Sequence, residues 1–446
     1  MAQYTLISNA QVVNEGHIQT ADVLIKDDRI EKIAKQLTAP ENACVIDANG
    51  KYLLPGMIDD QVHFRDPGLT HKADFHTESA AAVAGGITSV MDMPNTKPLT
   101  IDQAAIEAKH AHVAGRSHCN FGFYLGATND NIEAVKSIDP KLICGVKVFM
   151  GASTGNMLVD DEATLTAIFR EAPTLIATHC EDTPTILANE EKARLIWGEK
   201  VPIEEHPNIR SREACIKSTK LATGLALKYH ARLHVLHIST AEEVAMFRNV
   251  PTDQKRITAE ACVHFTWFDQ SDYAEKGTLI KCNPAIKKAS DKAAIISGIK
   301  DNRLDVIATD HAPHTRGEKA RPYFSAPSGL PLVQTALPSL LTQVNQGLFS
   351  LPDIVKKTAH SVADIFQVKN RGYVREGYFA DLVLVDMNAI VPVTDNDMLY
   401  KCGWTPYHGA RFSARIEKTW VNGQLKWDGR HVLGDSQGQP LHYQRD

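Results

Sequence analysis

Short apolar runs alternate with longer amphipathic runs along most of this 446-residue chain, and this alternation constrains the fold more than any other feature. Helix-like patterns such as IDQAAIEAKHAHVAG and EACIKSTKLATGLALKY separate runs that are rich in β-branched residues. Such repeated units predict an α/β fold with a parallel sheet. The strand-like runs are eight in number, which predicts a closed (β/α)8 TIM barrel. They lie at residues 56–64, 86–94, 119–127, 143–150, 174–181, 231–239, 257–265 and 304–314. An open doubly wound sheet is the alternative, but no GxGxxG motif opens the first helix.

The two ends of the chain depart from this rhythm. Short strand patterns joined by turns fill both flanks, as in TLISNAQVV and ADVLIKDDRIEKI near the start, and ADLVLVD and IEKTWVNGQLKWDG near the end. We therefore expect a small β-sandwich domain built from both termini. The expected division is 1–54 for its N-terminal part, 55–367 for the barrel and 368–446 for its C-terminal part.

Charge and cysteine usage exclude several classes of protein. The 48 basic and 53 acidic residues give a net charge of −5, without a long block of either sign that would bind nucleic acid or an anionic membrane. The eight cysteines form no CxxC pair, which is typical of a reducing compartment. The first residues lack the basic start and apolar block of a signal peptide, and no apolar stretch is long enough to span a bilayer, so we expect neither a secretory leader nor a membrane span. We expect a cytoplasmic enzyme with a small-molecule substrate, no nucleic-acid or membrane partner, and a homo-oligomeric state.

Polar residues occur where the predicted barrel strands end. In a TIM barrel, catalytic residues lie at the C-terminal ends of the strands, because the loops meet there over one mouth. A single His at such a place is more often a core or surface imidazole, but here the coincidence extends over most of the strands. The residues concerned are His63, Arg65, Asn95, Lys147, His179, His237, His264, Asp310, His311 and His314.

Lys147 lies in the middle of the apolar run GVKVF. Burial of an ammonium group without a partner is costly, so such a lysine changes its protonation state or pairs with another group. We therefore expect Lys147 to take part in chemistry or in metal binding. Imidazoles and carboxylates from separate strands are ligands of zinc, and a catalytic zinc keeps one position open for water. The sequence thus favours metal-assisted hydrolysis.

Several motifs together resemble a known family. In chain order they are LPGMIDDQVHFRDPG, MDMPNT, GVKVF, ATHCE, LHVLHIST, KCNPAIK and ATDHAPH. This set resembles the amidohydrolase superfamily and, within it, the dihydroorotases, and the resemblance covers essentially the whole chain. Hydantoinases and allantoinases share the same order of His, Lys, His, His and Asp, so a cyclic amide hydrolase of that type is the alternative.

The resemblance implies a set of metal ligands. Lys147 would be carbamylated by CO2 to give a bridging anionic ligand, in a site that holds one or two zinc ions. His179 and His237 would hold one zinc together with Lys147, and His63 and Asp310 would hold the other. Asp310 would also be the catalytic residue that moves a proton from the attacking water to the leaving ring nitrogen.

The resemblance also implies a substrate. Arg65, Asn95 and His314 would bind the substrate carboxylate, and Asn283 would contact the pyrimidine ring, while Ser153 and Thr154 would belong to a loop over the substrate. The reaction would be the reversible cyclisation of N-carbamoyl-L-aspartate to L-dihydroorotate in de novo pyrimidine biosynthesis. An arginine suits a planar carboxylate better than an uncharged hydantoin.

Gln61 departs from the family pattern. The first strand of the family reads D-x-H-x-H-x-R, and alignment on Asp59, His63 and Arg65 puts Gln61 in place of the first His. A neutral amide oxygen is a weaker zinc donor than imidazole. Gln61 ligates through its oxygen, or the site works without it, or the enzyme uses a single zinc. A catalytically inactive scaffold is a further alternative, although every other expected ligand is retained.

Overall fold

A closed barrel of parallel strands forms the body of the molecule in the computed structural model, which describes residues 2–151 and 157–445. Each of the eight predicted runs contains a strand, and the third contains two, β8 and β9. Their strongly apolar sequences follow from burial on both faces. The predicted (β/α)8 barrel is confirmed. The strands are β6 (Met57–Val62), β7 (Ile87–Asp92), β8 (Asn120–Phe123), β9 (Leu125–Gly126), β10 (Val146–Phe149), β11 (Ile176–His179), β12 (Leu233–Val235), β13 (Ile257–Cys262) and β14 (Val306–Ala308).

Two hydrogen-bonded sheets make up the barrel wall, with orders β6-β7-β8 and β14-β13-β12-β11-β10-β9. They meet where the third run lies beside the fourth, because Cys144 N donates to Phe123 O at 2.8 Å. They meet again where the last strand returns to the first, because Val62 forms a parallel bridge with His311. There the amide of His63 donates to His311 O at 2.7 Å. The barrel is therefore closed, and its strand ends share one rim.

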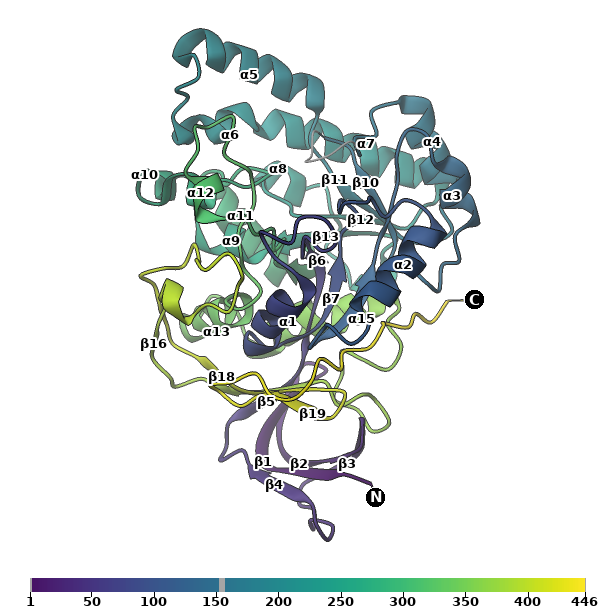
Figure 1. Cartoon of the computed structure of the whole chain (residues 1–446), viewed down its shortest axis with the longest axis vertical. Helices are drawn as coiled ribbons and strands as arrows, with labels where there is room; N and C mark the ends of the chain where they lie inside the picture. Colours follow the sequence, from purple (N-terminus) through teal and green to yellow (C-terminus); the bar gives the residue numbers. More distant parts are fainter. Residues whose placement is uncertain (1, 152–156, 446) are drawn as a thin grey trace.

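Helices surround the barrel (Figure 1). Those expected from the sequence are present, the longest being α7. One long helix, α5, was not expected from the sequence. It begins after Asp182, whose carboxylate caps the helix by accepting a hydrogen bond from Thr185 N at 3.1 Å. Figure 1 shows α5 at the end of the molecule away from the terminal sheet. Its apolar Leu195 and Ile196 are 82% and 72% exposed, so it lacks the single apolar face that marks a helix in sequence. The helices are α1 (Phe75–Ala84), α2 (Gln103–Val113), α3 (Ile132–Ser137), α4 (Glu162–Glu171), α5 (Thr183–Trp197), α6 (His206–Ile209), α7 (Arg212–Tyr229), α8 (Ala241–Val244), α9 (Val263–Trp267), α10 (Tyr273–Lys276), α11 (Ala289–Lys300), α12 (Arg316–Lys319), α13 (Ala336–Asn345), α14 (Leu351–Val355) and α15 (Ser361–Phe366).

Both chain ends contribute to one further sheet, seen at the bottom of Figure 1. Its order is β19-β18-β15-β5-β1-β2-β3, with β4 paired to β1. The antiparallel pairing of β5 with β15 joins the two termini. A separate apolar core fills this domain, which confirms the predicted β-sandwich from both ends, while the exact domain boundaries stay a prediction. The strands are β1 (Tyr4–Asn14), β2 (His17–Lys26), β3 (Arg29–Ala34), β4 (Cys44–Asp47), β5 (Tyr52–Pro55), β15 (Leu382–Asp386), β18 (Arg415–Val421) and β19 (Gln424–Trp427), and a short pair β16 (Val391–Pro392) and β17 (Arg411–Phe412) lies outside this sheet.

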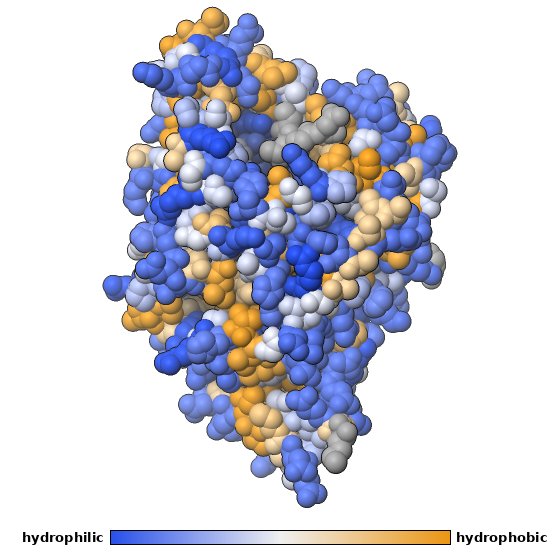
Figure 2. All heavy atoms as spheres, viewed as in Figure 1, coloured by the Kyte–Doolittle hydropathy of each residue, from blue (hydrophilic) through white to orange (hydrophobic). Residues whose placement is uncertain are grey.

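The face of the molecule in Figure 2 is mostly hydrophilic, with apolar side chains gathered in a band over its lower half. Among the helices of the described residues, none combines the length and the apolar character that crossing a membrane requires.

A buried ion pair fixes the rim where the first two strands end. Lys109 Nζ in α2 lies 2.6 Å from Asp92 Oδ2 at the end of β7, and it also donates to Met93 O at 3.2 Å. The other oxygen of Asp92 accepts from the amide of Phe64 at 2.7 Å. Phe64 lies between His63 and Arg65, so this pair holds the backbone of two predicted site residues.

We expect Lys109→Met to destabilise the protein by about 3–5 kcal/mol, because it leaves the carboxylate of Asp92 buried and unpaired. The side chains of Lys109 and Asp92 are 2% and 0% exposed. Urea unfolding followed by circular dichroism measures the change. The matched control is Lys136→Met, which breaks an exposed pair with Glu133 and should cost less than about 1 kcal/mol. Equal effects of the two substitutions would contradict the role of the buried pair.

Candidate active site

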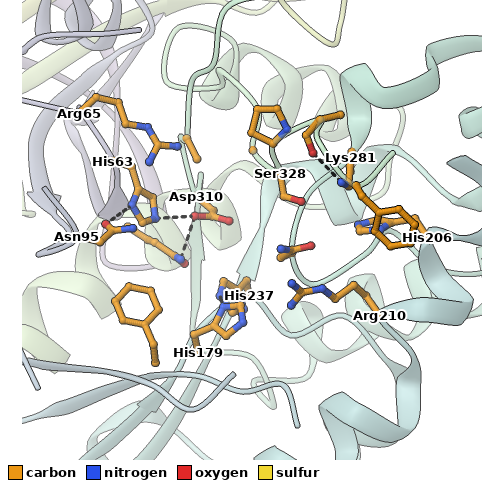
Figure 3. A pocket seen from close by; sticks show the side chains of 18 of the residues that line it. His63, Arg65, Asn95, His179, His206, Arg210, His237, Lys281, Asp310 and Ser328 are labelled. Carbon is orange, nitrogen blue, oxygen red and sulfur yellow. Dashed lines mark hydrogen bonds and ion pairs between the residues drawn. The ribbon is translucent and has the colours of Figure 1, made fainter. Parts of the chain in front are cut away.

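A cavity of about 280 Å³ opens at the C-terminal ends of the barrel strands. Its volume and its mixed polar lining suit a small molecule. Figure 3 shows side chains from separate strands converging on it. Nine of the predicted site residues line it, namely Gln61, His63, Arg65, Asn95, Lys147, His179, His237, Asn283 and Asp310. Ser153 and Thr154 lie outside the described residues.

Asp310 is the centre of one group in the cavity. His63 Nε2 lies 3.3 Å from Asp310 Oδ1 (Figure 3). Gln61 Nε2 donates to the same oxygen at 3.1 Å. Burial alone would raise the pKa of Asp310, but the hydrogen bond and charge of His63 and the nearby His237 lower that pKa to about 2. Asp310 is therefore a carboxylate at neutral pH and is able to accept a proton.

The orientation of His63 leaves an imidazole lone pair in the cavity. Nδ1 of His63 lies 2.8 Å from Asn95 Oδ1 and donates to it, because an amide oxygen only accepts. The hydrogen bond to Asp310 then requires a second proton, on Nε2; in the neutral ring Nε2 instead carries a lone pair directed at that carboxylate. Two electron-pair donors that face one another require a cation or a proton between them. Asn95 thus fixes the imidazole as a potential metal ligand.

His179 and His237 form a second group in the cavity. Nδ1 of His179 lies 3.0 Å from Nε2 of His237, and the rings pack edge to face. Nε2 of His179 donates to Glu181 Oε2 at 2.9 Å, so Nδ1 is the nitrogen that is free to ligate. Although burial raises the pKa of Glu181, Arg210 and His179 lower it to about 2. Glu181 is therefore an anion that orients His179.

Lys147 lies between these groups and is 1% exposed. Among the described residues, no acceptor forms a hydrogen bond with its Nζ, which lies 4.6 Å from the centre of the Phe149 ring. Burial lowers the pKa of Lys147 to about 8, against the opposing effect of Asp310 and Glu260. Most of this amine is therefore still protonated at neutral pH, but its neutral fraction is much larger than that of an exposed lysine. The sequence-based expectation of an altered protonation state agrees with this environment.

Arg65 forms one wall of the cavity, and its guanidinium is largely buried. Its Nε donates to Pro313 O at 3.3 Å, and burial lowers its pKa to about 10. The predicted partner His314 does not line the cavity but lies behind Arg65, with Nε2 of the ring 3.1 Å from Nη2 of Arg65. Because Lys72 donates to Nδ1 of His314 at 3.0 Å, Nε2 carries the proton and donates to Ser328 O. With this tautomer Nε2 cannot accept a hydrogen bond, so His314 packs against Arg65 without accepting from it.

Three of the site residues have left-handed backbone angles. The φ values are 64° for Arg65, 42° for His237 and 51° for Asp310. Each residue lies two or three positions after the end of a barrel strand, and its side chain lines the cavity. Such conformations are unfavourable for residues other than glycine, and they persist where the surrounding structure enforces them.

The far side of the cavity carries residues that the sequence did not reveal. Figure 3 shows Arg210, Lys281 and His206 opposite the group of His63 and Asp310. Lys281 donates to the carbonyls of Tyr323 and Ala326, each at 2.6 Å. These residues lie in loops and in the short helix α6, where no strand or helix period identifies a facing side chain. The one available signal was the motif KCNPAIK, from which only Asn283 was taken.

Asn283 connects Arg210 with Ser328, and all three residues line the cavity. With its amide oriented to satisfy its neighbours, Oδ1 accepts from Arg210 at 3.2 Å and Nδ2 donates to Ser328 Oγ at 3.1 Å. Arg210 also donates to Glu181 Oε2 at 2.8 Å. Asn283, which was predicted to contact the pyrimidine ring of the substrate, is therefore held in a fixed orientation at the edge of the cavity.

A further group of potential metal ligands lies in the described part of the chain. Asp60, His234 and Glu260 are fully buried, and their ligand atoms lie within 4.8 Å of one another. Asp60 and Glu260 were not expected as functional residues, although an acid in an apolar strand was an available signal. The structure thus offers acid and imidazole groups that could hold a metal.

Comparison with known proteins identifies the family. The Amidohydrolase family model matches residues 52–426. The dihydroorotase of Halobacterium salinarum is 34% identical over 424 residues, which cover 94% of this chain and 96% of that protein. The dihydroorotase of Methanosarcina acetivorans is 31% identical over 432 residues, which cover 94% and 91%.

A solved structure with the same fold is L-hydantoinase (dihydropyrimidinase) from Arthrobacter aurescens. It matches with a TM-score of 0.93 at 24% identity, over 99% of this chain and 100% of that one. At this identity the likeness concerns the fold, and it agrees with the barrel and terminal sheet described above. From the matched family model, the full-length relatives and the cavity at the barrel mouth, we conclude that the chain belongs to the amidohydrolase family and is an enzyme of the cyclic amide hydrolase type.

Proposed function

We propose that the protein is a zinc-dependent dihydroorotase, which interconverts N-carbamoyl-L-aspartate and L-dihydroorotate in de novo pyrimidine biosynthesis. The observation that carries this proposal is the guanidinium of Arg65, which lines the same cavity as the imidazoles and Asp310. A buried guanidinium with one bond to a carbonyl retains donors for a planar anion such as a carboxylate. The similarity to dihydroorotases over most of the chain supports the same substrate.

The donor set of the cavity fits zinc. His179 and His237 with Lys147 would hold one ion, and His63 with Asp310 would hold a second. The lone pairs of His63 and His179 point into the cavity because Asn95 and Glu181 accept the protons of the opposite ring nitrogens. Zinc bound there would supply a Lewis acid for the amide carbonyl and would lower the pKa of a water molecule to about 7.

Lys147 is suited to react with CO2. Its lowered pKa provides a neutral amine, which adds to CO2 with loss of one proton to give an anionic carbamate. This carbamate would replace a buried ammonium by a ligand for cations, so it would remove the cost of burying Lys147. We propose that Lys147 is carbamylated in the active enzyme.

Gln61 is seated as a partner of Asp310. Its amide nitrogen donates to Asp310 Oδ1, and its oxygen lies 4.0 Å from Cys262 Sγ. An amide nitrogen carries no lone pair for a metal. We therefore propose that Gln61 orients Asp310, and that the ion beside His63 is held by fewer protein ligands and more weakly than the ion beside His179.

The protein groups would act as follows during ring opening. Arg65 and Asn95 would bind the substrate carboxylate, and Asn283 would contact the ring from the opposite wall. Asp310, a carboxylate with a pKa of about 2, would accept the proton of the attacking water and pass it to the ring nitrogen as the amide bond breaks. Ring closure follows the reverse path.

The proposed function predicts turnover of dihydroorotate in preference to uncharged cyclic amides. The purified protein should open L-dihydroorotate, and turnover of hydantoin or allantoin should be at least ~10-fold lower in kcat/KM. Asp310→Ala should abolish turnover, because it removes the proton acceptor. Preferential turnover of hydantoin or allantoin would identify the alternative enzyme type. Absence of turnover in a zinc-free, folded protein would identify an inactive scaffold.

Lys147→Ala should lower the zinc content of the purified protein sharply and abolish activity. The reason is that the ligand shared by the two ions is lost. Metal analysis by inductively coupled plasma mass spectrometry gives the stoichiometry. The matched control is Lys357→Ala, which removes another lysine that is 1% exposed but donates to Leu304 O away from the cavity. Wild-type zinc in the Lys147 variant would refute the bridging role.

Arg65→Met should raise KM for dihydroorotate about 10- to 150-fold, because a hydrogen bond to a charged group contributes about 1.5–3 kcal/mol. The zinc content should stay at the wild-type value, since Arg65 holds no metal in this proposal. Arg65→Lys should restore only part of the affinity, because an ammonium does not form a bidentate pair with a carboxylate. An unchanged KM in the Met variant would remove Arg65 from the substrate site.

The cytoplasmic location and the homo-oligomeric state stay predictions. The exposed apolar side chains of α5 support an oligomer, because residues of this kind are common at subunit interfaces.

A further inference from the structure

The group of Asp60, His234 and Glu260 lies inside the barrel, on strands β6, β12 and β13. All three side chains are 0% exposed. Asp60 directly precedes Gln61, and His234 lies three residues before His237, so the group is close to the catalytic residues along two strands. It contains none of the residues that line the catalytic cavity.

Within residues 2–151 and 157–445, the group contains polar atoms without a hydrogen-bond partner. These atoms are both carboxylate oxygens of Asp60, Nε2 of His234 and Oε2 of Glu260. Nε2 of His234 lies 3.2 Å from Asp60 Oδ2 and 3.9 Å from Glu260 Oε2, without forming a hydrogen bond to either. Buried polar groups in native proteins are nearly always paired, so several unpaired atoms facing one point indicate a missing ligand.

The protonation of His234 follows from its other nitrogen. Nδ1 lies 2.8 Å from Thr258 Oγ1, and that hydroxyl donates to Leu233 O at 3.3 Å. Since the single proton of Thr258 is used on the carbonyl, its oxygen accepts the Nδ1 proton of His234. Nε2 therefore carries the lone pair of the neutral ring and directs it toward the two carboxylates. This arrangement resembles that of a metal-binding histidine whose second nitrogen is held by a hydrogen bond.

The charge of the group also requires a cation. When both carboxylates are ionised beside a neutral imidazole, the group carries two negative charges in a low-dielectric interior, where uncompensated charge is strongly unfavourable. A water molecule would pair with the oxygens but would leave the charge in place. A divalent cation would neutralise it.

We propose that Asp60, His234 and Glu260 form a buried structural site for a divalent transition metal, with zinc as the best-suited ion. Zinc bonds of about 2.0–2.2 Å in tetrahedral geometry separate neighbouring ligand atoms by roughly 3.4 Å, which lies between the two separations observed here. One imidazole and two carboxylates form a ligand set that zinc accepts. Because both oxygens of Asp60 are unpaired, Asp60 can supply a fourth donor and close the site.

The buried ion would also position a catalytic group. Glu260 Oε1 accepts from the amide of His237 at 2.8 Å, while its Oε2 faces the proposed ion. His237 has the left-handed φ of 42° that directs its imidazole into the cavity. An ion held by Glu260 would thus fix the backbone of a catalytic-site ligand and would connect strands β6, β12 and β13. Asp60, His234 and Glu260 are positioning residues in this proposal.

The direct test is a crystal structure of the full-length protein, prepared with Zn2+, with anomalous data on both sides of the zinc edge. We expect an anomalous peak about 2.1 Å from Nε2 of His234 and from oxygens of Asp60 and Glu260. The site is closed to solvent, so this ion should remain after dialysis against a chelator that removes zinc from the open cavity. A folded wild-type protein without a peak at this place would overturn the proposal. In that case a proton on His234, in place of a metal ion, would neutralise part of the charge of the two carboxylates.

Metal stoichiometry in variants provides a second test that separates this site from the catalytic one. Lys147→Ala should keep one chelator-resistant zinc per chain, and addition of Asp60→Asn, which keeps the shape but removes the charge, should eliminate it. The matched control is His360→Gln, which replaces a buried imidazole with both nitrogens bonded, to Glu15 N and Gly372 O. Retention of the resistant zinc in the Asp60 variant would refute the site. Failure of dihydroorotate turnover would refute the proposed function and leave this result unaffected.

Discussion

The return of the last barrel strand to the first is the constraint on which the site depends. The amide of His63 donates to His311 O, and the bridge between Val62 and His311 continues the sheet across this seam. Gln61 and Asp310 are 249 residues apart in sequence, yet they meet in a hydrogen bond because the seam is closed. The parallel direction of the strands then brings every strand's C-terminal end to the same rim. An open sheet would leave Asp310 and His63 at opposite edges.

Charge in the barrel interior explains why the polar residues occur in groups. Lys147, Asp310 and the imidazoles form one level at the rim, and Asp60, His234 and Glu260 form another inside the barrel. At each level, electron-pair donors face one another in a low-dielectric environment, which is unfavourable unless a cation or a proton lies between them. Glu260 connects the levels through the amide of His237. The backbone position of His237 at the rim therefore depends on the carboxylate of Glu260, which belongs to the inner group of polar residues.

The agreement between sequence and structure follows from how local each signal is. All the barrel strands were predictable because burial on both faces produces apolar runs that are independent of distant residues. Helix α5 escaped prediction because Leu195 and Ile196 face solvent and blur its pattern. Nine predicted site residues line the cavity because strand ends specify the rim, whereas Arg210 and Lys281 reach it from loops that carry no period. His314 is not among the residues that line the cavity and contacts Arg65, so its predicted role at the substrate stays a prediction.

The sequence by itself determined the order of strands and helices, the contribution of both termini to a second domain, and the set of residues at the strand ends. These features depend on residue spacing and on the apolar or polar character of neighbours. Only the tertiary structure decided which side chains meet. It paired the amide nitrogen of Gln61 with Asp310, and it gathered Asp60, His234 and Glu260 around one point. The physical reason is that such contacts join residues on distant strands, and barrel closure and strand register, which no local pattern contains, set their distances.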